Sequence, residues 1–267
     1  MLEKERQQLI LDMLTEQNFA SVRTLSDQLN SSEATIRRDL AKLEDVGRLK
    51  RIRGGAQVLE MEKQTRRPSL QGTAFLAAKE KQASVKRRIA EKAVELCVDG
   101  ESIIVNGGSS TYMMGEFLAQ RRVSVLTNSY YLARDLIDNS DIQVTLPGGE
   151  VYRKQGIILS AFDNDTIQNY HGSKMFMGTP GIGDYGVMES DPLLIRAEQK
   201  LMKQADQLII LADSSKIGVR SNFIFEPLEN VDILITDTHA EDRYIQLFEQ
   251  HGINVIMVER ENSLDKH

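Results

Sequence analysis

Two patterns of apolar positions divide the chain. Up to about residue 57, apolar residues recur every three or four positions, whereas beyond residue 100 they gather into short continuous runs. The first pattern is typical of amphipathic helices, and the second is typical of strands buried on both faces of a parallel sheet. The sequence therefore predicts a small helical domain followed by a larger α/β domain.

The most strongly patterned helix follows Ser31 and Ser32. Both serines are good N-cap residues, and Glu33 places a carboxylate in the first turn of the helix. A spacing of i, i+4 and i+7 predicts one apolar stripe, made of Ile36, Leu40 and Leu43. The opposite face of the helix is then free to contact another molecule.

Hydroxyl and basic side chains gather on that free face and in the segment after the helix. Gly54 and Gly55 allow a tight turn there, so the segment is predicted to form a short hairpin, or wing. A helix in the major groove with a basic wing on the phosphate backbone is a common way to bind DNA. The candidate DNA-binding residues are Ser32, Thr35, Arg37, Arg38, Lys50, Arg51 and Arg53. The alternative is a solvated charged surface, but capping, spacing, charge and turn residues all agree with DNA binding.

The residues before this helix complete a winged helix-turn-helix over residues 1–58. Residues 4–17 predict a first helix, and residues 19–22 predict a short extended piece. Thr24 is expected to cap a second helix that turns its leucines inward.

The segment from Arg6 to Ala56 resembles the DNA-binding domain of the DeoR family of bacterial repressors of sugar metabolism. The resemblance is carried by the run SSEATIRRDL, a Leu-Glu-x-x-Gly-x-Leu step and the Gly-Gly of the wing. Arg53 departs from it, because the family more often has histidine or tyrosine there. The resemblance implies a repressor that binds double-stranded operator DNA as a homodimer or homotetramer.

Residues 59–78 lack periodicity and contain Pro68, Gly72 and mixed charge, which predicts a linker. The α/β domain is then expected over residues 79–267, beginning with a helix at 79–96 that is basic on one side. That helix either packs the linker onto the domain or contacts DNA, and packing is the favoured interpretation.

Seven short apolar runs in the second domain predict strands, separated mostly by helical stretches. This alternation predicts an α/β fold with a largely parallel sheet covered on both faces, where ligands bind at the carboxyl ends of strands. The runs are residues 102–106, 123–127, 142–146, 174–178, 207–213, 231–237 and 253–258.

Glycine, hydroxyl and lysine residues stand at several of these strand ends. Glycines allow close backbone approach, hydroxyls and a helix N-terminus can hold a phosphate, and lysine meets an anion as a point charge. The candidate effector-binding residues are Asn106, Gly107, Gly108, Ser109, Ser110, Thr111, Thr127, Asn128, Ser129, Gly148, Gly149, Asp213 and Lys216. Each loop alone is commonly a turn or a cap, but together they predict a site for a phosphorylated metabolite.

The second domain resembles the DeoR-family effector domain, which is similar in fold to ribose-5-phosphate isomerase and CoA-transferase relatives. The family's Asp-Ser-Ser-Lys loop is intact at 213–216, but its Asp-x-Gly-Thr-Thr loop becomes NGGSST, with Asn106 in place of the acid. The runs AEQK (197–200) and DSSKIG (213–218) resemble the subgroup that represses L-ascorbate utilisation, and Leu194 stands where many other members carry an acid. The resemblance implies that the effector is a phosphorylated sugar or sugar acid, for example a molecule similar to L-ascorbate 6-phosphate.

Two functions of different classes follow from this. The first is a repressor controlled by a sugar phosphate, and the second is a sugar-phosphate isomerase with an accessory DNA-binding domain. The second needs a general base, and the candidates Glu150, Asp184 and Glu198 have no paired partner that the sequence reveals. We therefore expect no enzymatic activity and no catalytic residue.

Charge adds to the two-domain interpretation. The net charge is −6, yet residues 1–92 carry 19 Lys and Arg against 13 Asp and Glu, a balance of +6. Residues 93–267 carry 14 against 26, a balance of −12, so the basic first domain is the expected DNA end.

Composition narrows the remaining possibilities. Cys97 is the single cysteine and the four histidines are scattered, so no disulfide framework, metal site or cofactor is expected. No apolar run approaches the roughly 20 residues of a membrane span, and the charged N-terminus is unlike a signal peptide. A cytoplasmic protein without a membrane partner is the expectation.

Overall fold

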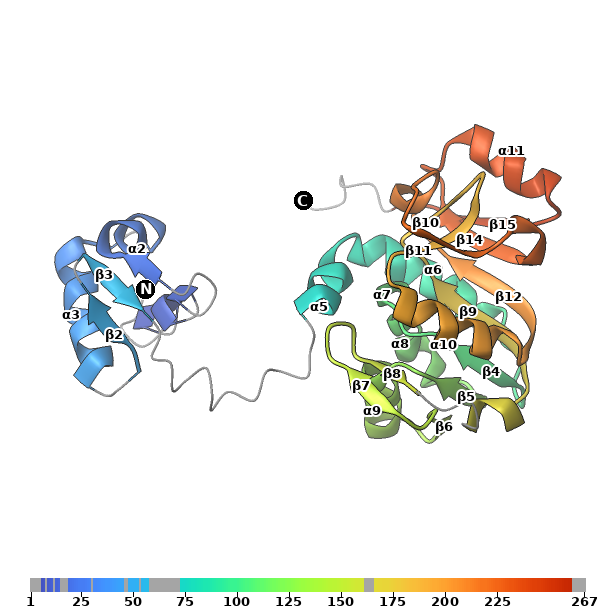
Figure 1. The fold of residues 1–267 in the computed structure, drawn as a ribbon, viewed down its shortest axis with the longest axis horizontal. Helices are drawn as coiled ribbons and strands as arrows, with labels where there is room; N and C mark the ends of the chain where they lie inside the picture. Colours follow the sequence, from blue (N-terminus) through green and yellow to red (C-terminus); the bar gives the residue numbers. More distant parts are fainter. Residues whose placement is uncertain are drawn as a thin grey trace. The chain divides into compact units, whose positions relative to one another are not determined.

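The computed structural model describes most of the chain in two compact units, Met1–Ser69 and Leu70–His267 (Figure 1). The described residues are 6–7, 9–11, 13–14, 19–29, 31–45, 48–52, 54–57, 73–160 and 166–260. None of the helices in these ranges combines the length and apolarity that crossing a bilayer requires.

The N-terminal unit is a winged helix-turn-helix, as predicted. The described residues between 6 and 14 are helical. They are followed by β1 (Phe19–Ser21), α2 (Val22–Gln28), α3 (Glu33–Asp45), β2 (Lys50–Ile52) and β3 (Gly55–Gln57). The three strands form one antiparallel sheet in the order β1-β3-β2. Its core includes the fully buried residues Ile10, Leu14, Leu25, Ile36, Leu40 and Leu49.

Serine side chains start both described helices of the helix-turn-helix. Ser32 caps α3 as predicted, because its Oγ accepts a hydrogen bond of 3.2 Å from the backbone N–H of Thr35. The predicted cap at Thr24 is wrong. The residue that caps α2 is Ser21, whose Oγ accepts from the Thr24 N–H at 3.0 Å. The helix begins earlier because Ser21 ends β1 in an extended conformation that suits a cap.

A buried ion pair ties α3 to the first helical segment. The Asp39 side chain is almost fully buried on the core side of α3 and accepts a hydrogen bond from Arg6 Nε at 2.6 Å. A buried carboxylate needs such a partner, because its desolvation would otherwise cost on the order of several kcal/mol. That cost is comparable to the whole free energy of unfolding of a small domain. The pair fixes the rotation of α3 about its own axis.

The two glycines of the wing have different roles. Gly54 has φ of +86°, a left-handed conformation that other residues rarely adopt. Gly55 packs against β1, so closely that a Cβ would lie 2.2 Å from the carbonyl oxygen of Ala20. The hairpin therefore requires one glycine for its turn and the other for its contact with β1.

The C-terminal unit is built on a parallel sheet of seven strands in its described part, in the order β15-β14-β12-β9-β4-β5-β6 (Figure 1). All seven predicted apolar runs contribute a strand. The strands are β4 (Ser102–Val105), β5 (Ser124–Thr127), β6 (Gln143–Thr145), β9 (Gly172–Gly178), β12 (Ala205–Leu211), β14 (Ile233–Asp237) and β15 (Asn254–Val258). Each neighbouring pair in the sheet is parallel.

Helices cover both faces of this sheet. Phe176 of β9 packs on one face with residues of α6 (Ala83–Glu95), α8 (Met114–Leu118) and α9 (Tyr130–Asn139). The neighbouring Met175 and Met177 point to the opposite face, where α10 (Pro192–Met202) and α11 (Asp242–Gln250) pack. Burial on both faces explains why the strands are continuous apolar runs.

Smaller elements surround the main sheet. A hairpin, β7 (Glu150–Tyr152) and β8 (Ile157–Leu159), follows β6. An antiparallel sheet joins β10 (Gly181–Gly183), β11 (Gly186–Glu189) and β13 (Phe223–Glu226). The remaining short elements are α7 (Ser109–Tyr112), η1 (Thr166–Asn169), η2 (Ser214–Lys216) and η3 (Leu228–Asn230).

The predicted linker, residues 59–78, extends too far. Its last residues belong to helix α5 (Thr73–Glu80), in which Phe75 is buried. The Phe75 ring stacks on Tyr131 at 4.6 Å and meets the edge of Tyr112 at 5.3 Å. The predicted helix at 79–96 is also divided, because Gln82 has φ of +57° between α5 and α6. As favoured, α6 packs on the sheet.

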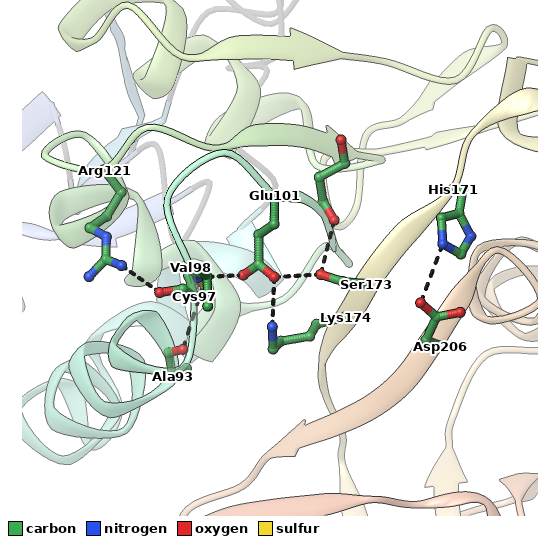
Figure 2. A network of polar contacts seen from close by, with 10 residues as sticks. Ala93, Cys97, Val98, Glu101, Arg121, His171, Ser173, Lys174 and Asp206 are labelled. Carbon is green, nitrogen blue, oxygen red and sulfur yellow. Dashed lines mark hydrogen bonds and ion pairs between the residues drawn. The ribbon is translucent and has the colours of Figure 1, made fainter.

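Polar contacts hold the amino ends of the strands, opposite the ends that carry ligands in such sheets (Figure 2). Glu101, just before β4, accepts hydrogen bonds from Lys174 Nζ at 2.7 Å and from Ser173 Oγ at 2.6 Å. Nearby, burial raises the pKa of the Cys97 thiol to about 12, and its sulfur lies 3.8 Å from the Ala93 carbonyl oxygen. Cys97 is therefore an unreactive packing residue.

We expect Gly55→Ala to destabilise the N-terminal unit by more than about 2 kcal/mol, because its Cβ meets backbone that cannot move aside. Gly54→Ala is the matched control, since it adds strain of about 1 kcal/mol at a position with open space around it. Hydrogen exchange of backbone amides in α3 measures the stability of this unit. Equal effects of the two substitutions would contradict the packing of the wing on β1.

Candidate functional site

The exposed face of α3 presents the predicted DNA-binding side chains. Arg38 is exposed and makes no hydrogen bond or ion pair with another described residue. Arg37 is also exposed, but its guanidinium donates to Glu33 Oε2 at 2.9 Å one turn earlier. The hydroxyls of Ser32 and Thr35 lie 2.9 Å apart at the start of the helix. Of these side chains, Arg38 is the one most available to a partner.

The wing is fixed to α3 by a contact that sequence reasoning missed. Glu44 Oε1 accepts the backbone N–H of Arg51 at 2.8 Å, and Glu44 Oε2 lies 3.7 Å from the Arg51 guanidinium. Lys50 and Arg51 are exposed along β2, whereas Arg53 lies outside the described residues. Helix and wing therefore form one basic surface of fixed geometry.

A cavity of about 270 Å³ lies at the carboxyl ends of β4 and β9 in the C-terminal unit. Five predicted effector residues line it, namely Gly107, Gly108, Ser109, Ser110 and Lys216. The lining residues that were not predicted as effector-binding are Phe75, Ala78, Lys81, Lys86, Gln155, Ile157, Gly178, Thr179, Pro180, Glu189, Ser190, Leu194 and Glu198. The cavity thus gathers loops that are far apart in the sequence.

The loop after β4 is shaped by two asparagines. The Gly107 N–H donates to Asn106 Oδ1 at 2.8 Å and to Asn128 Oδ1 at 2.7 Å. A Cβ at Gly107 would lie 2.9 Å from the Ile157 side chain, so glycine lets the chain pass under the β7–β8 hairpin. Ser109 and Ser110 follow on the cavity wall.

Three lysines line this cavity, and one of them is buried. Lys86 Nζ donates to the carbonyl of Ala78, and burial lowers the pKa of Lys86 although the Asp213 carboxylate opposes the shift. Lys81 and Lys216 also line this cavity. A signal for Lys86 exists in the sequence, because it stands on the apolar stripe of its helix, four residues before Ala90. A charge on such a stripe marks a site or a buried pair.

The loop that carries Lys216 is held by a buried carboxylate at the end of β14. Asp237 accepts hydrogen bonds from the Ser214 N–H at 2.7 Å and from Arg260 Nε at 2.8 Å. Arg260 also donates to Ser214 Oγ at 2.8 Å. Burial opposes ionisation of Asp237, yet these hydrogen bonds outweigh it and keep its pKa below the usual value. Lys216 is thus carried on a fixed loop.

Two carboxyl side chains line the cavity together with the lysines. Glu198 is 2% exposed, and Asn106 Nδ2 donates to its Oε1 at 2.9 Å. Burial, followed by the charge of Glu189, raises the pKa of Glu198 to about 8. Glu189 itself accepts the N–H groups of Ser190 at 2.6 Å and Asp191 at 3.0 Å. The environment of Glu198 therefore favours its protonated form at pH 7, whereas the carboxyl group of Glu189 is held by backbone N–H groups.

Of the candidate general bases, Glu198 alone lies at this cavity. Asp184 is exposed and pairs with Arg220 at 3.2 Å. Glu150 is exposed and lines a different cavity. The environment of Glu198 could not be predicted from the sequence, because its hydrogen-bond partner Asn106 is 92 residues away in the chain.

Several predicted effector residues do not line this cavity. Their side chains instead form hydrogen bonds with backbone groups. The Thr111 hydroxyl donates to the Gly108 carbonyl at 3.1 Å, and Thr127 Oγ1 accepts the Ser129 N–H at 3.0 Å. Ser129 caps α9 through the Leu132 N–H. Asp213 Oδ1 likewise accepts the N–H of its own loop at Ser215. These are the turn and cap roles that were the alternative interpretation.

The last predicted loop lies elsewhere. Asn128 and Gly149 line a second cavity of about 810 Å³ beside the β7–β8 hairpin and α10. Gly148 lines neither cavity. Gly149 has φ of +142°, and a Cβ there would lie 2.2 Å from the Leu159 carbonyl oxygen, so its role is to close the hairpin.

Two regions of the chain match family models. Residues 6–62 match the DeoR-like helix-turn-helix domain, and residues 81–238 match the DeoR C terminal sensor domain. The HTH-type transcriptional regulator UlaR of Shigella dysenteriae serotype 1 is 33% identical over 258 residues, which cover 97% of this chain and 100% of that protein. UlaR of Salmonella arizonae is 34% identical over the same shares.

The chain is also similar to parts of solved structures. Ribose 5 phosphate isomerase A from Neisseria gonorrhoeae is 19% identical, with a TM-score of 0.39 over 51% of this chain and 53% of that one. For eIF2B beta from Chaetomium thermophilum the identity is 13% and the TM-score 0.41, over 63% and 54%. The family matches and the relatives that align over nearly the whole chain show that it belongs to the DeoR family of transcriptional regulators, with a helix-turn-helix domain and a sensor domain.

Proposed function

We propose that the protein represses a carbohydrate-utilisation operon and is controlled by a phosphorylated sugar or sugar acid that binds the cavity at the ends of β4 and β9. The observation that carries this proposal is the polarity of the cavity. Lys81, Lys86 and Lys216 offer positive charge to a phosphate, while Glu189 and Glu198 offer polar groups to the rest of a small ligand.

The size of the cavity supports a small metabolite. Its volume of about 270 Å³ is at the lower limit of ligand cavities, which range from about 300 to 1,000 Å³. Phe75, Ile157 and Leu194 add apolar wall that can pack against the carbon chain of the ligand.

The resemblance to repressors of L-ascorbate utilisation supports an effector like L-ascorbate 6-phosphate. One of the two runs that carry that resemblance, residues 213–218, contains Lys216 of the cavity wall. The other, residues 197–200, contains Glu198. We further propose that the protein acts in the cytoplasm as a homodimer or homotetramer, so that two helix-turn-helix domains bind a two-fold symmetric operator.

An isomerase-type enzyme is the second candidate, and the buried Glu198 with its raised pKa is the observation that favours it. Two features weigh against it. Asn106 stands where an acid would serve as a base, and Glu198 keeps its proton at neutral pH. Incubation with ribose 5-phosphate or L-ascorbate 6-phosphate, followed by NMR of the products, tests this candidate, and turnover would establish it.

We expect Arg38→Ala to weaken binding to an operator selected from random DNA by about 1–3 kcal/mol, because a base contact from α3 is lost.

Arg51→Ala should weaken specific and non-specific DNA binding alike. It should also lower the slope of log K against log salt concentration by about one unit, because a phosphate contact is lost. Fluorescence anisotropy at several salt concentrations measures both.

Arg243→Ala is the matched control, because this arginine is exposed in α11 of the sensor domain. It should leave DNA binding unchanged. Wild-type operator affinity of Arg38→Ala would show that α3 does not read the DNA.

We expect Lys216→Ala to abolish the response to the effector without changing DNA binding in its absence. A ligand shifts an equilibrium only through its different affinity for two states, so a ligand that no longer binds shifts nothing. The measurement is operator affinity with and without L-ascorbate 6-phosphate and the best ligand from a thermal-shift screen of phosphorylated sugars.

Lys200→Ala is the control, since Lys200 lines the second cavity. It should leave the response intact. The reverse result, a response lost in Lys200→Ala and kept in Lys216→Ala, would place the effector in the second cavity.

A further inference from the structure

The two oxygens of Glu198 have different surroundings. Oε1 accepts a hydrogen bond of 2.9 Å from Asn106 Nδ2, whereas Oε2 is buried and has no hydrogen-bond partner among the described residues. The orientation of the Asn106 amide is fixed, because its Oδ1 accepts the Gly107 N–H at 2.8 Å. Oε1 is therefore an acceptor, and a proton on this carboxyl group belongs on Oε2.

The charges around Glu198 favour its neutral form. Glu189 of β11 and Asp191 at the start of α10 both oppose ionisation of Glu198, in addition to its burial. Lys81, Lys86 and Lys216 are the cations that line the same cavity, and none of them forms an ion pair with Glu198. An unpaired buried carboxyl group avoids the cost of desolvation by keeping its proton.

A neutral carboxylic acid donates one hydrogen bond from its O–H group. A buried donor without a partner is costly, so a ligand that brings an acceptor oxygen to it gains binding energy. Glu198 lines the cavity, and because Oε2 itself has almost no accessible surface, a ligand acceptor must displace part of the cavity wall to supply the partner that Oε2 lacks.

We propose that Glu198 is a specificity-determining residue that donates a hydrogen bond from Oε2 to a carbonyl or carboxylate oxygen of the effector, at the end away from its phosphate. This inference rests on the proposed function and narrows it. The effector is then a phosphorylated sugar acid or sugar lactone, and a phosphorylated polyol of the same length binds more weakly.

A matched pair of ligands tests this selectivity. D-Glucitol 6-phosphate and 6-phospho-D-gluconate are open chains of the same configuration and differ only at one end, which is a hydroxymethyl group in the first and a carboxylate in the second. Isothermal titration calorimetry at pH 7 should show that the wild-type protein binds 6-phosphogluconate at least about tenfold more tightly, since hydrogen bonds to an ionised acceptor are the stronger ones.

The proton on Glu198 makes this preference depend on pH. The donor is present below a pKa of about 8 and is lost as the pH rises through that value, so the preference should disappear at pH 9 in the wild-type protein. Glu198→Gln places an amide donor at the same position and cannot ionise, so it should keep the preference at both pH values. Glu198→Leu has no donor and should lose it at both.

Inorganic phosphate separates the two proposals. Binding of inorganic phosphate at pH 7 depends on the lysines of the cavity and should be equal in wild type and in Glu198→Gln. Failure of phosphate and of both ligands to bind would overturn the proposed function. Binding of phosphate with no gain from 6-phosphogluconate, or equal binding of the two ligands at pH 7, would overturn the role of Glu198 alone.

The protein without ligand gives an independent readout. Because the pKa of Glu198 is raised on folding, its contribution to stability is complete below its unfolded pKa of about 4.5 and is lost as the pH rises through about 8. The Tm of wild type and of Glu198→Gln is measured between pH 5 and 9 at intervals of about one pH unit. Relative to Glu198→Gln, the wild-type Tm should fall across this range. A constant difference in Tm across that range would overturn the proposal, because Glu198 would then be ionised throughout.

Discussion

The parallel direction of the seven described strands is the constraint on which the sensor domain depends. Parallel strands bury both faces, and their carboxyl ends all lie at one edge of the sheet. Chemistry at that edge is therefore assembled from loops that are distant in the sequence. The loop after β4 brings Asn106 and Gly107, the loop after β12 brings Lys216, and α10 brings Glu198. The opposite edge holds ion pairs such as Lys174 with Glu101, which fix strands rather than bind ligands.

The two units differ in charge in a way that suits their roles. Residues 1–69 carry 13 Lys and Arg against 11 Asp and Glu, and residues 70–267 carry 20 against 28, so phosphate is weakly attracted to the N-terminal unit and repelled by the C-terminal unit. Within the acidic domain the proposed effector cavity is an exception, because three lysines line it. Long-range repulsion keeps the polyanion away, while short-range contacts in an enclosed cavity can still select a small phosphorylated molecule.

Sequence reasoning succeeded where local rules decide the structure. Every predicted apolar run became a strand, and Ser32 became the cap of α3, because burial periodicity and capping depend on neighbours in the chain. It failed where a tertiary contact decides. Phe75 extends the sensor domain into the predicted linker through its aromatic contacts with Tyr112 and Tyr131. These two residues lie 37 and 56 positions after Phe75 in the sequence. Thr127 and Ser129 carry the same residue types as a phosphate loop, and only the structure shows that their hydroxyls are already bonded to backbone.

Phe75 belongs both to the wall of the proposed effector cavity and to the first described helix of the sensor domain. Helix α5 is the first described element after residue 57, and Phe75 lines the proposed effector cavity while it stacks on Tyr131. A ligand in the cavity therefore contacts the element that immediately follows the connection to the DNA-binding domain. Contact alone transmits nothing, because a ligand must bind two arrangements of the protein with different affinity to change their populations. Phe75 meets that requirement if its packing differs between the two arrangements, since the cavity wall that the ligand contacts then differs as well.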